Sequence, residues 1–343
     1  MAVATEQRCA RALNEALLDL FEQRDDVFLL GEDILDPYGG AFKITQGLST
    51  RWPERVLTTP VSEPALFGVA AGMALRGYRP ILEIMFGDFI ALGFDQIVNG
   101  IAKFHDMFDG NVRVPLVVRA PMGGGRGYGP THSQSLEKLL LGVPGITVVA
   151  ANECQDLAAL LREAVADDDP VFLIENKLMY GRPNRRPVEG RIGELECRET
   201  DSRYPALLFS GNGFADATAT IVTYGGMLPV ALDAAVALIL EDEIFTEVVA
   251  LGQLLPLDLE PVLESLARTG AVVTLEEGTL TAGVGAEIAA RVQGEAWDDL
   301  KAPVRRVAAA DSAIPAAGAL EASMLPGVQD VVDAVRSIRR PRG

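Results

Sequence analysis

The strongest constraint on the fold is the alternation of short apolar runs with segments of helical spacing along most of the chain. In the N-terminal half, the apolar runs stand at 27–31, 80–84, 115–119, 146–150 and 171–174. Stretches of helical spacing stand at 5–23, 63–75, 90–108 and 153–166. This alternation predicts a mainly parallel sheet with helices on both faces, a doubly wound α/β domain.

A second alternation predicts a second, smaller α/β domain, because 343 residues exceed the usual size of one core. After Tyr180 the sequence becomes loop-like, and apolar periodicity resumes at 218–225. We therefore predict one domain at 1–185, a linker at 186–215 and a second domain at 216–343. The expected elements are helices at 228–240, 258–268, 283–293 and from Val328, and strands at 245–250, 271–275 and 304–307.

Charge and composition exclude several functional classes. The chain has 30 basic and 48 acidic residues, a formal net charge of -18, which repels nucleic-acid phosphates and anionic lipid surfaces. No run approaches the roughly 18 apolar residues that span a bilayer, and the N-terminus lacks a secretory pattern. We expect a cytoplasmic protein with neither nucleic acid nor a membrane as partner. Three widely separated cysteines predict neither disulfides nor a zinc site.

Glu63 is the leading candidate for chemistry. It stands where a short strand is expected to end and a glycine- and alanine-rich helix to begin, in an otherwise nearly uncharged segment. Burial among Leu66, Phe67 and Val69 would let its carboxylate share a proton with a ligand. The alternative is an acid that only complements the helix dipole, worth about 0.3–1 kcal/mol.

Several further motifs, in their order and spacing, carry a family resemblance. They are G-E-D at 31–33, G-A-F-K-I-T-Q-G-L at 40–48, E-x4-G-V-A-A-G at 63–72, the run from Glu83, G-G-G-R-G-Y-G at 123–129 and T-H-S-Q-S at 131–135. From about residue 5 to 335, the chain resembles the beta subunit of the E1 component of 2-oxo acid dehydrogenases, which are transketolase-like thiamine diphosphate enzymes. The resemblance implies an N-terminal pyrimidine-binding domain and a transketolase C-terminal-like domain.

The resemblance also implies roles for three side chains. Glu63 matches the glutamate that hydrogen-bonds the aminopyrimidine ring of thiamine diphosphate and favours the tautomer that accepts the thiazolium proton. Phe89 matches the aromatic residue that packs on that ring; ordinary core packing is the alternative. His132 matches a histidine near the substrate that assists acyl transfer to a lipoyl group. Its alternative is a turn histidine bonded to backbone.

Metal binding is divided between this chain and a partner in the implied family. A monovalent cation, commonly potassium, is held there through oxygens that match Leu116, Ala164, Val165, Asp167 and Asp169, although 162–170 by itself looks like a charged helix end. The superfamily binds the cofactor diphosphate through Mg²⁺ and a G-D-G motif, which this chain lacks. A separate E1 alpha subunit carrying that motif is implied, in an alpha2beta2 heterotetramer.

The implied activity is the oxidative decarboxylation of a small 2-oxo acid, with acyl transfer to the lipoamide of an E2 acyltransferase. Leu92 stands where pyruvate-type members carry an amide, so the local sequence is closer to branched-chain and acetoin dehydrogenases. Two alternatives are a two-component thiamine-dependent carboligase without lipoyl transfer and a non-catalytic assembly subunit. Gly68 and Gly72, on one helical face, indicate close packing, against another subunit as in the family or inside this one.

Overall fold

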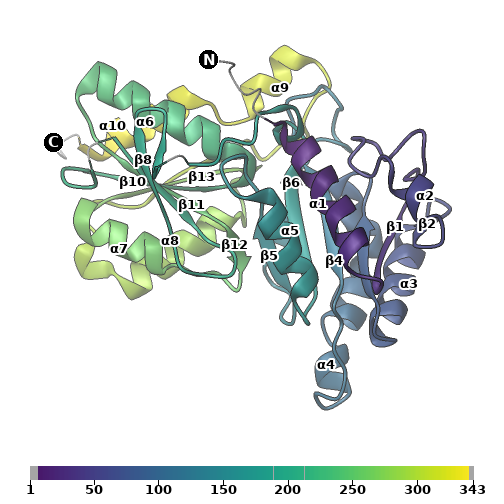
Figure 1. Cartoon of the computed structure of the whole chain (residues 1–343). Coiled ribbons are helices and arrows are strands. Elements are labelled where there is room, and N and C mark those ends of the chain that lie inside the picture. The colour runs from purple at the N-terminus through teal and green to yellow at the C-terminus, as the bar shows by residue number, and fades with distance from the viewer. Residues whose placement is uncertain (1–6, 188, 212, 340–343) are drawn as a thin grey trace. The chain divides into compact units, whose positions relative to one another are not determined.

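The structure, a computed structural model, describes residues 7–187, 189–211 and 213–339, and its chain divides into two compact units (Figure 1). The first unit contains the chain up to Met122 together with Leu139–Arg185. The second contains Gly123–Lys138 and the chain from Arg186 onward. The glycine-rich stretch and His132 therefore group with the C-terminal unit, although in the sequence they stand between two strands of the N-terminal unit.

The N-terminal unit is built on a parallel sheet, as predicted. Its strands follow the order β5-β6-β4-β3-β1-β2, and every neighbouring pair among them is parallel. Both faces must be covered, because nearly every residue of these strands is buried. The strands are β1 (Val27–Gly31), β2 (Val56–Thr58), β3 (Arg79–Glu83), β4 (Val117–Met122), β5 (Thr147–Ala150) and β6 (Val171–Asn176).

Helices cover the two faces of this sheet. The connection β2-α3-β3 and the connection β5-α5-β6 run in opposite directions across the sheet, so right-handed crossovers place α3 and α5 on opposite faces. Helix α1 packs beside α5 (Figure 1). The longer helices are α1 (Cys9–Gln23), α3 (Glu63–Leu75) and α5 (Leu157–Ala166), and the short ones are α2 (Leu48–Arg51), α4 (Phe104–Met107), η1 (Gly87–Gly93), η2 (Gln96–Ile101), η3 (Glu137–Leu139) and η4 (Met179–Gly181).

The single helix predicted at 90–108 was wrong. Three short pieces replace it: the 3-10 helix η1, the π-helix η2 and the one-turn helix α4. Gly93 shows one physical reason, because a Cβ there would lie 2.2 Å from the ring of Phe67 on α3. This close approach of η1 to α3 requires glycine at that point, and glycine weakens a continuous helix.

The C-terminal unit holds a mixed sheet in the order β14-β13-β10-β11-β9-β8-β7. Its first four strands are parallel, and β9, β8 and β7 add in antiparallel fashion. The last three lie within 186–215, the segment we predicted as a linker. They are short, and β7 and β8 carry charged residues, which makes this part of the sequence resemble a loop. The strands of this sheet are β7 (Arg191–Ile192), β8 (Leu195–Glu199), β9 (Leu207–Ser210), β10 (Thr220–Tyr224), β11 (Glu247–Leu251), β13 (Val272–Thr279) and β14 (Arg305–Ala309). The short strand β12 (Gln253–Leu255) follows β11 in the chain and is not part of this sheet.

Helices also cover both faces of the second sheet. Helix α6 packs beside α10, and α7 and α8 lie on the other face (Figure 1). The direction of the crossovers requires this arrangement, since β10-α6-β11 runs across the sheet against β11-α7-β13. The helices are α6 (Leu228–Asp242), α7 (Glu260–Thr269), α8 (Val284–Glu295), α9 (Gly318–Met324) and α10 (Val328–Arg339), with the short turns η5 (Gly225–Met227) and η6 (Trp297–Asp299).

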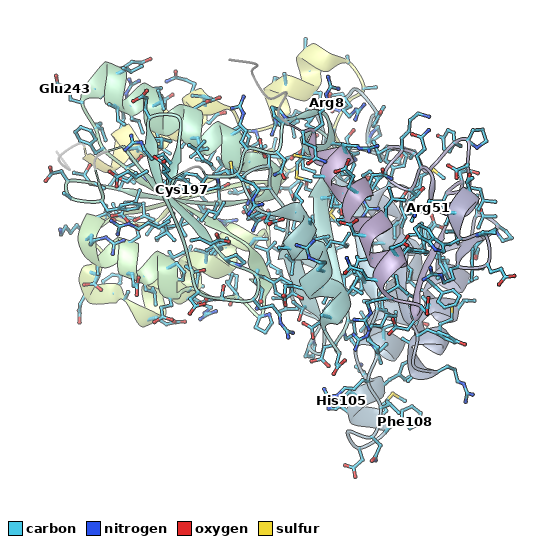
Figure 2. All side chains as sticks on the ribbon, viewed as in Figure 1. Arg8, Arg51, His105, Phe108, Cys197 and Glu243 are labelled. Carbon is cyan, nitrogen blue, oxygen red and sulfur yellow. The ribbon has the colours of Figure 1, made fainter. Side chains whose placement is uncertain are left out.

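The three cysteines are free and buried, as expected for structural thiols. Burial raises the pKa of Cys9 and of Cys197 to about 12, which keeps both as thiols near neutral pH. Cys197 lies on β8 in the C-terminal unit (Figure 2). Within the described residues, no helix has the length and apolar character needed to cross a membrane.

Candidate active site

Glu63 is the first residue of α3, and its side chain is only 3% exposed. Pro64 follows it, a residue that favours the first turn of a helix. An acidic residue in the first turn complements the positive end of the helix dipole. In the described part of the chain, no group donates a hydrogen bond to the Glu63 carboxylate. A buried acceptor without an internal donor suits a ligand that brings its own N–H group.

A second buried acid, Glu32, stands beside this helix start and was not assigned a role from the sequence. It directly follows β1, is 5% exposed, and accepts a hydrogen bond from the backbone N–H of Ser62 at 3.1 Å. Burial and then the negative charge of Glu63 raise the pKa of the Glu32 carboxyl. The G-E-D motif could have indicated this residue from the sequence, because it directly follows a strand. In parallel sheets, binding sites form at the carboxyl ends of the strands.

Phe89 lies on η1 within a group of aromatic rings. Its ring centroid is 6.2 Å from that of Phe86 in an edge-on arrangement, and Phe86 stands 5.8 Å from Phe42. Phe42 in turn contacts Tyr180, with centroids 5.0 Å apart. Phe89 is half-buried, and rings held edge to face keep their orientation. The structure therefore places Glu63 and Phe89 in the same N-terminal unit, with Phe89 on a rigid aromatic wall.

A buried ionic cluster supports this wall from three adjacent strands. Arg119 on β4 bonds Glu83 on β3 at 2.6 Å and grips Glu175 on β6 through two bonds of 2.9 and 2.7 Å. Tyr180 donates to Glu175 at 2.5 Å, which joins the cluster to the aromatic rings. Although burial opposes it, the charges of Glu175 and Glu83 raise the pKa of Arg119, so the guanidinium remains charged.

The positions predicted for a monovalent cation fall at one end of the N-terminal sheet. The carbonyl oxygens of Val165 and Asp167 converge there, since both accept hydrogen bonds from the Arg79 guanidinium, at 2.9 and 2.6 Å. The carbonyl of Leu116 accepts from the N–H of Val171 at 2.9 Å. Ala164 is buried at the end of α5, and the carboxylate of Asp169 pairs with Arg113 at 3.1 Å. Two of the five predicted oxygens therefore lie close together, and the guanidinium groups of Arg79 and Arg113 already engage three of the five positions.

His132 lies in the C-terminal unit, on the loop that follows the glycine-rich stretch. Its backbone N–H bonds the carbonyl of Gly129 at 3.3 Å, and its Nδ1 lies 2.9 Å from the hydroxyl of Thr131. The ring is half-buried. The Thr131 hydroxyl can either donate to Nδ1 or accept from it, so this contact fits both neutral tautomers of the imidazole.

Comparison with known proteins places the chain in a family. The model of the transketolase pyrimidine binding domain matches residues 6–183, and that of the transketolase C-terminal domain matches residues 215–331. A pyruvate dehydrogenase E1 component subunit beta from Rickettsia bellii is 38% identical over 95% of this chain and 97% of its own length. The chain belongs to the family of 2-oxo acid dehydrogenase E1 beta subunits. The predictions of family and fold are thus confirmed.

Other relatives of this E1 beta subunit show the breadth of the family. The beta subunit of acetoin:2,6-dichlorophenolindophenol oxidoreductase from Cupriavidus necator is 36% identical over 95% of each chain. A solved structure described as a split gene transketolase, inactive beta4 tetramer, superposes with a TM-score of 0.73 at 25% identity, covering 97% of this chain and 98% of that one. The E1 beta subunit is accordingly part of a thiamine diphosphate-dependent oxidoreductase with a transketolase-like fold.

Proposed function

We propose that this E1 beta subunit combines with a separate alpha subunit, as an alpha2beta2 heterotetramer, to decarboxylate a 2-oxo acid oxidatively and pass the acyl group to the lipoyl arm of an E2 acyltransferase. Glu63 carries the proposal. It is a buried carboxylate at a helix start with no donor among the described residues, in a chain that lacks the G-D-G motif. Half of a cofactor site is therefore present in this chain.

The residues of this chain fit the aminopyrimidine end of thiamine diphosphate. When bound, the cofactor supplies a carbon acid whose deprotonated form attacks the 2-oxo carbonyl. Glu63 accepts a hydrogen bond from a ring nitrogen and moves a proton with it, which requires an acid rather than an amide. The ring of Phe89 orients the heterocycle by face contact. Glu32 lies beside the start of α3, and burial, together with the negative charge of Glu63, raises the pKa of its carboxyl.

The outer face of α3 supports contact with another subunit. Gly68, Val69 and Gly72 are exposed there, and Val69, which we expected to be buried near Glu63, is 52% exposed. A Cβ added to either glycine would meet no atom of the described chain within 4 Å, so packing inside this chain does not require them. Two glycines on an open helical face allow the backbone of a partner to approach closely.

The two metal ions of the family would be bound by different subunits. Mg²⁺ would lie on the alpha subunit with the diphosphate, because this chain has no G-D-G motif. A potassium ion would share the carbonyl oxygens of Val165 and Asp167 with Arg79, and a carbonyl oxygen has two lone pairs for this purpose. No chemical step proposed for this chain depends on that ion.

Co-expression with the alpha subunit tests the function. The assembled protein should oxidise a 2-oxo acid with an artificial electron acceptor and also acylate a lipoyl domain, whereas the beta subunit alone should not bind thiamine diphosphate stably. The panel of substrates should include pyruvate, a branched-chain 2-oxo acid and acetoin. Leu92 and the names of the relatives point to different members of this set. Carbon-carbon bond formation without lipoyl acylation would instead identify a carboligase. Tight cofactor binding by the isolated chain would contradict the divided site.

His132 can be tested by separating the two half-reactions. We expect His132→Ala to slow lipoyl acylation by about 100-fold while decarboxylation changes much less, because general acid-base catalysis contributes on this order. The chain's other histidine provides the control. His105 bonds the carbonyl of Val112 at 2.9 Å and lies on α4 (Figure 2), so His105→Ala should leave the ratio of the two rates unchanged. Equal loss in both half-reactions would contradict this role for His132.

A further inference from the structure

The glycine-rich loop at 123–129, which leads to His132, needs contacts with other segments to stay in one conformation. Four of its glycines, at 123, 125, 127 and 129, have positive φ angles of 97°, 80°, 69° and 77°. Glycine adopts these angles easily, but it also loses the most conformational freedom when it becomes ordered. A loop of this composition needs external contacts to keep one conformation, and those contacts then decide where His132 lies.

Two carboxylates of the C-terminal unit supply such contacts. Glu321 on α9 accepts hydrogen bonds from the backbone N–H groups of Gly125 at 2.8 Å and Gly127 at 2.9 Å, one on each carboxylate oxygen. Glu277 on β13 accepts from the N–H of Gly124 at 2.5 Å. Hydrogen bonds to an ionised acceptor are roughly twice as strong as neutral ones. Three backbone N–H groups of the loop are thus hydrogen-bonded to carboxylates of the C-terminal unit.

The side chain of Glu321 is buried and directs both of its carboxylate oxygens at this loop. Its side chain is 2% exposed, and in the described part of the chain it forms no ion pair. A buried carboxylate without a cation is costly unless hydrogen bonds replace the lost water. The loop amides do so, and the fit is close, because a Cβ at Gly124 would lie 3.1 Å from the Glu321 carboxylate and 3.0 Å from Leu325.

The chain beyond His132 is fixed to the same unit. The N–H of Gly123 bonds the carbonyl of Gln134 at 3.1 Å and closes the loop around His132. Further along, Glu137 is buried and accepts a hydrogen bond from the hydroxyl of Tyr224 at 2.6 Å. Lys138 bonds the carbonyl of Thr281 at 2.9 Å. His132 is therefore held between two anchored ends, of which the glycine-rich end depends on Glu321 and Glu277.

We propose that Glu321 is a positioning residue of the active site, which orders the glycine-rich loop through the N–H groups of Gly125 and Gly127 and so places His132 for acyl transfer. This inference rests on the proposed function of His132 and extends it to a second residue of the same C-terminal unit. Its effect should appear only in the half-reaction that needs His132.

The test compares Glu321→Gln with wild type in the assembled alpha2beta2 protein. Glutamine presents an NH₂ group to one of the two peptide N–H donors, so one hydrogen bond is lost and the charge disappears. We expect kcat for lipoyl-domain acylation to fall roughly 10- to 100-fold, because misplacing a catalytic group by about 1 Å costs this much. KM for the lipoyl domain and the rate of decarboxylation with an artificial acceptor should stay within about twofold of wild type.

Two further measurements separate positioning from general stability. Amide hydrogen exchange at 124–127 should become faster in Glu321→Gln, while exchange in β10 and β13 stays slow. In a His132→Ala background, adding Glu321→Gln should cause no further loss of acylation, since both variants remove the same function. Glu321→Asp, which keeps the charge, should fall between glutamine and wild type. Glu243→Gln, an exposed acid at the end of α6 (Figure 2), is the matched control and should behave as wild type.

The outcomes distinguish this inference from the function on which it rests. If wild type does not acylate a lipoyl domain at all, the proposed function fails. If wild type acylates and His132→Ala is impaired, but Glu321→Gln and Glu321→Asp both match wild type, only the positioning role fails. An equal fall of both half-reactions in the two Glu321 variants, with a lowered melting temperature, would also overturn it and leave Glu321 as a structural residue.

Discussion

Replacing Glu63 by glutamine should lower the rate of 2-oxo acid decarboxylation by the assembled E1 component at least about 100-fold. Glutamine has the same length and can still hydrogen-bond a ring nitrogen, but it cannot exchange a proton readily. Because Glu63 is buried at the start of α3, the substitution changes charge with little change in packing. Cofactor affinity, measured by calorimetry on the assembled protein, should therefore change much less than turnover.

The neighbouring acid makes this prediction sharper. The negative charge of Glu63 contributes to the raised pKa of Glu32, so Glu63→Gln should lower the Glu32 pKa toward its ordinary value. Glu54→Gln, an exposed acid before β2, is the control and should retain full activity. Near-normal decarboxylation by Glu63→Gln would reject the assignment of Glu63, and an equally inactive Glu54→Gln would show that the assay reports assembly instead.

Replacing Arg119 by methionine should destabilise the N-terminal unit by about 3–5 kcal/mol, because it leaves the buried carboxylates of Glu83 and Glu175 without their shared cation. Arg119 is 1% exposed and bonds both acids, and it links strands β3, β4 and β6. Adding Glu83→Gln and Glu175→Gln to the variant should restore much of the lost stability, since no uncompensated charge then remains.

The tryptophans allow this measurement on the full chain, which has two units and need not unfold in one step. Trp52 lies in the N-terminal unit, with its ring 5.5 Å from that of Phe21, and Trp297 lies in the C-terminal unit. In a Trp297→Phe background, fluorescence during urea unfolding reports the N-terminal unit. Arg11→Met is the control, because the exposed pair of Arg11 with Glu15 should contribute at most about 1 kcal/mol. A shift for Arg119→Met no larger than this would contradict the argument.

Much of the fold followed from periodicity, and the exceptions have physical causes. The parallel N-terminal sheet and the helices α6, α7, α8 and α10 stand close to their predicted positions, because buried strands and amphipathic helices have patterns that short windows reveal. The helix predicted at 90–108 was wrong, and the close approach of Gly93 to Phe67 on α3 is one physical reason. We did not predict strands β7–β9, because short antiparallel strands gain much of their stability from sheet neighbours rather than from their own composition.

The candidate site shows the same division. Motif position predicted Glu63, Phe89 and His132 as site residues, whereas the contacts of Glu32 and Glu321 became visible only in the structure. Glu32 accepts a hydrogen bond from Ser62, which lies 30 positions later in the sequence. Glu321 accepts one from Gly125, which lies 196 positions earlier. No local pattern encodes a carboxylate that will face the peptide groups of a distant loop. The predicted cation positions illustrate the converse, because the sequence did not reveal that Arg79 engages two of their carbonyls.

By itself, the sequence determined that this protein has two α/β domains, a carboxylate where a helix begins, and no G-D-G motif. These are local properties, since they depend on residue spacing within a few turns. Only the tertiary structure decided that Gly123–Lys138 belongs with the C-terminal unit and that buried carboxylates hold the loop of His132. The reason is that charge-assisted hydrogen bonds between distant segments form only when the whole chain has folded.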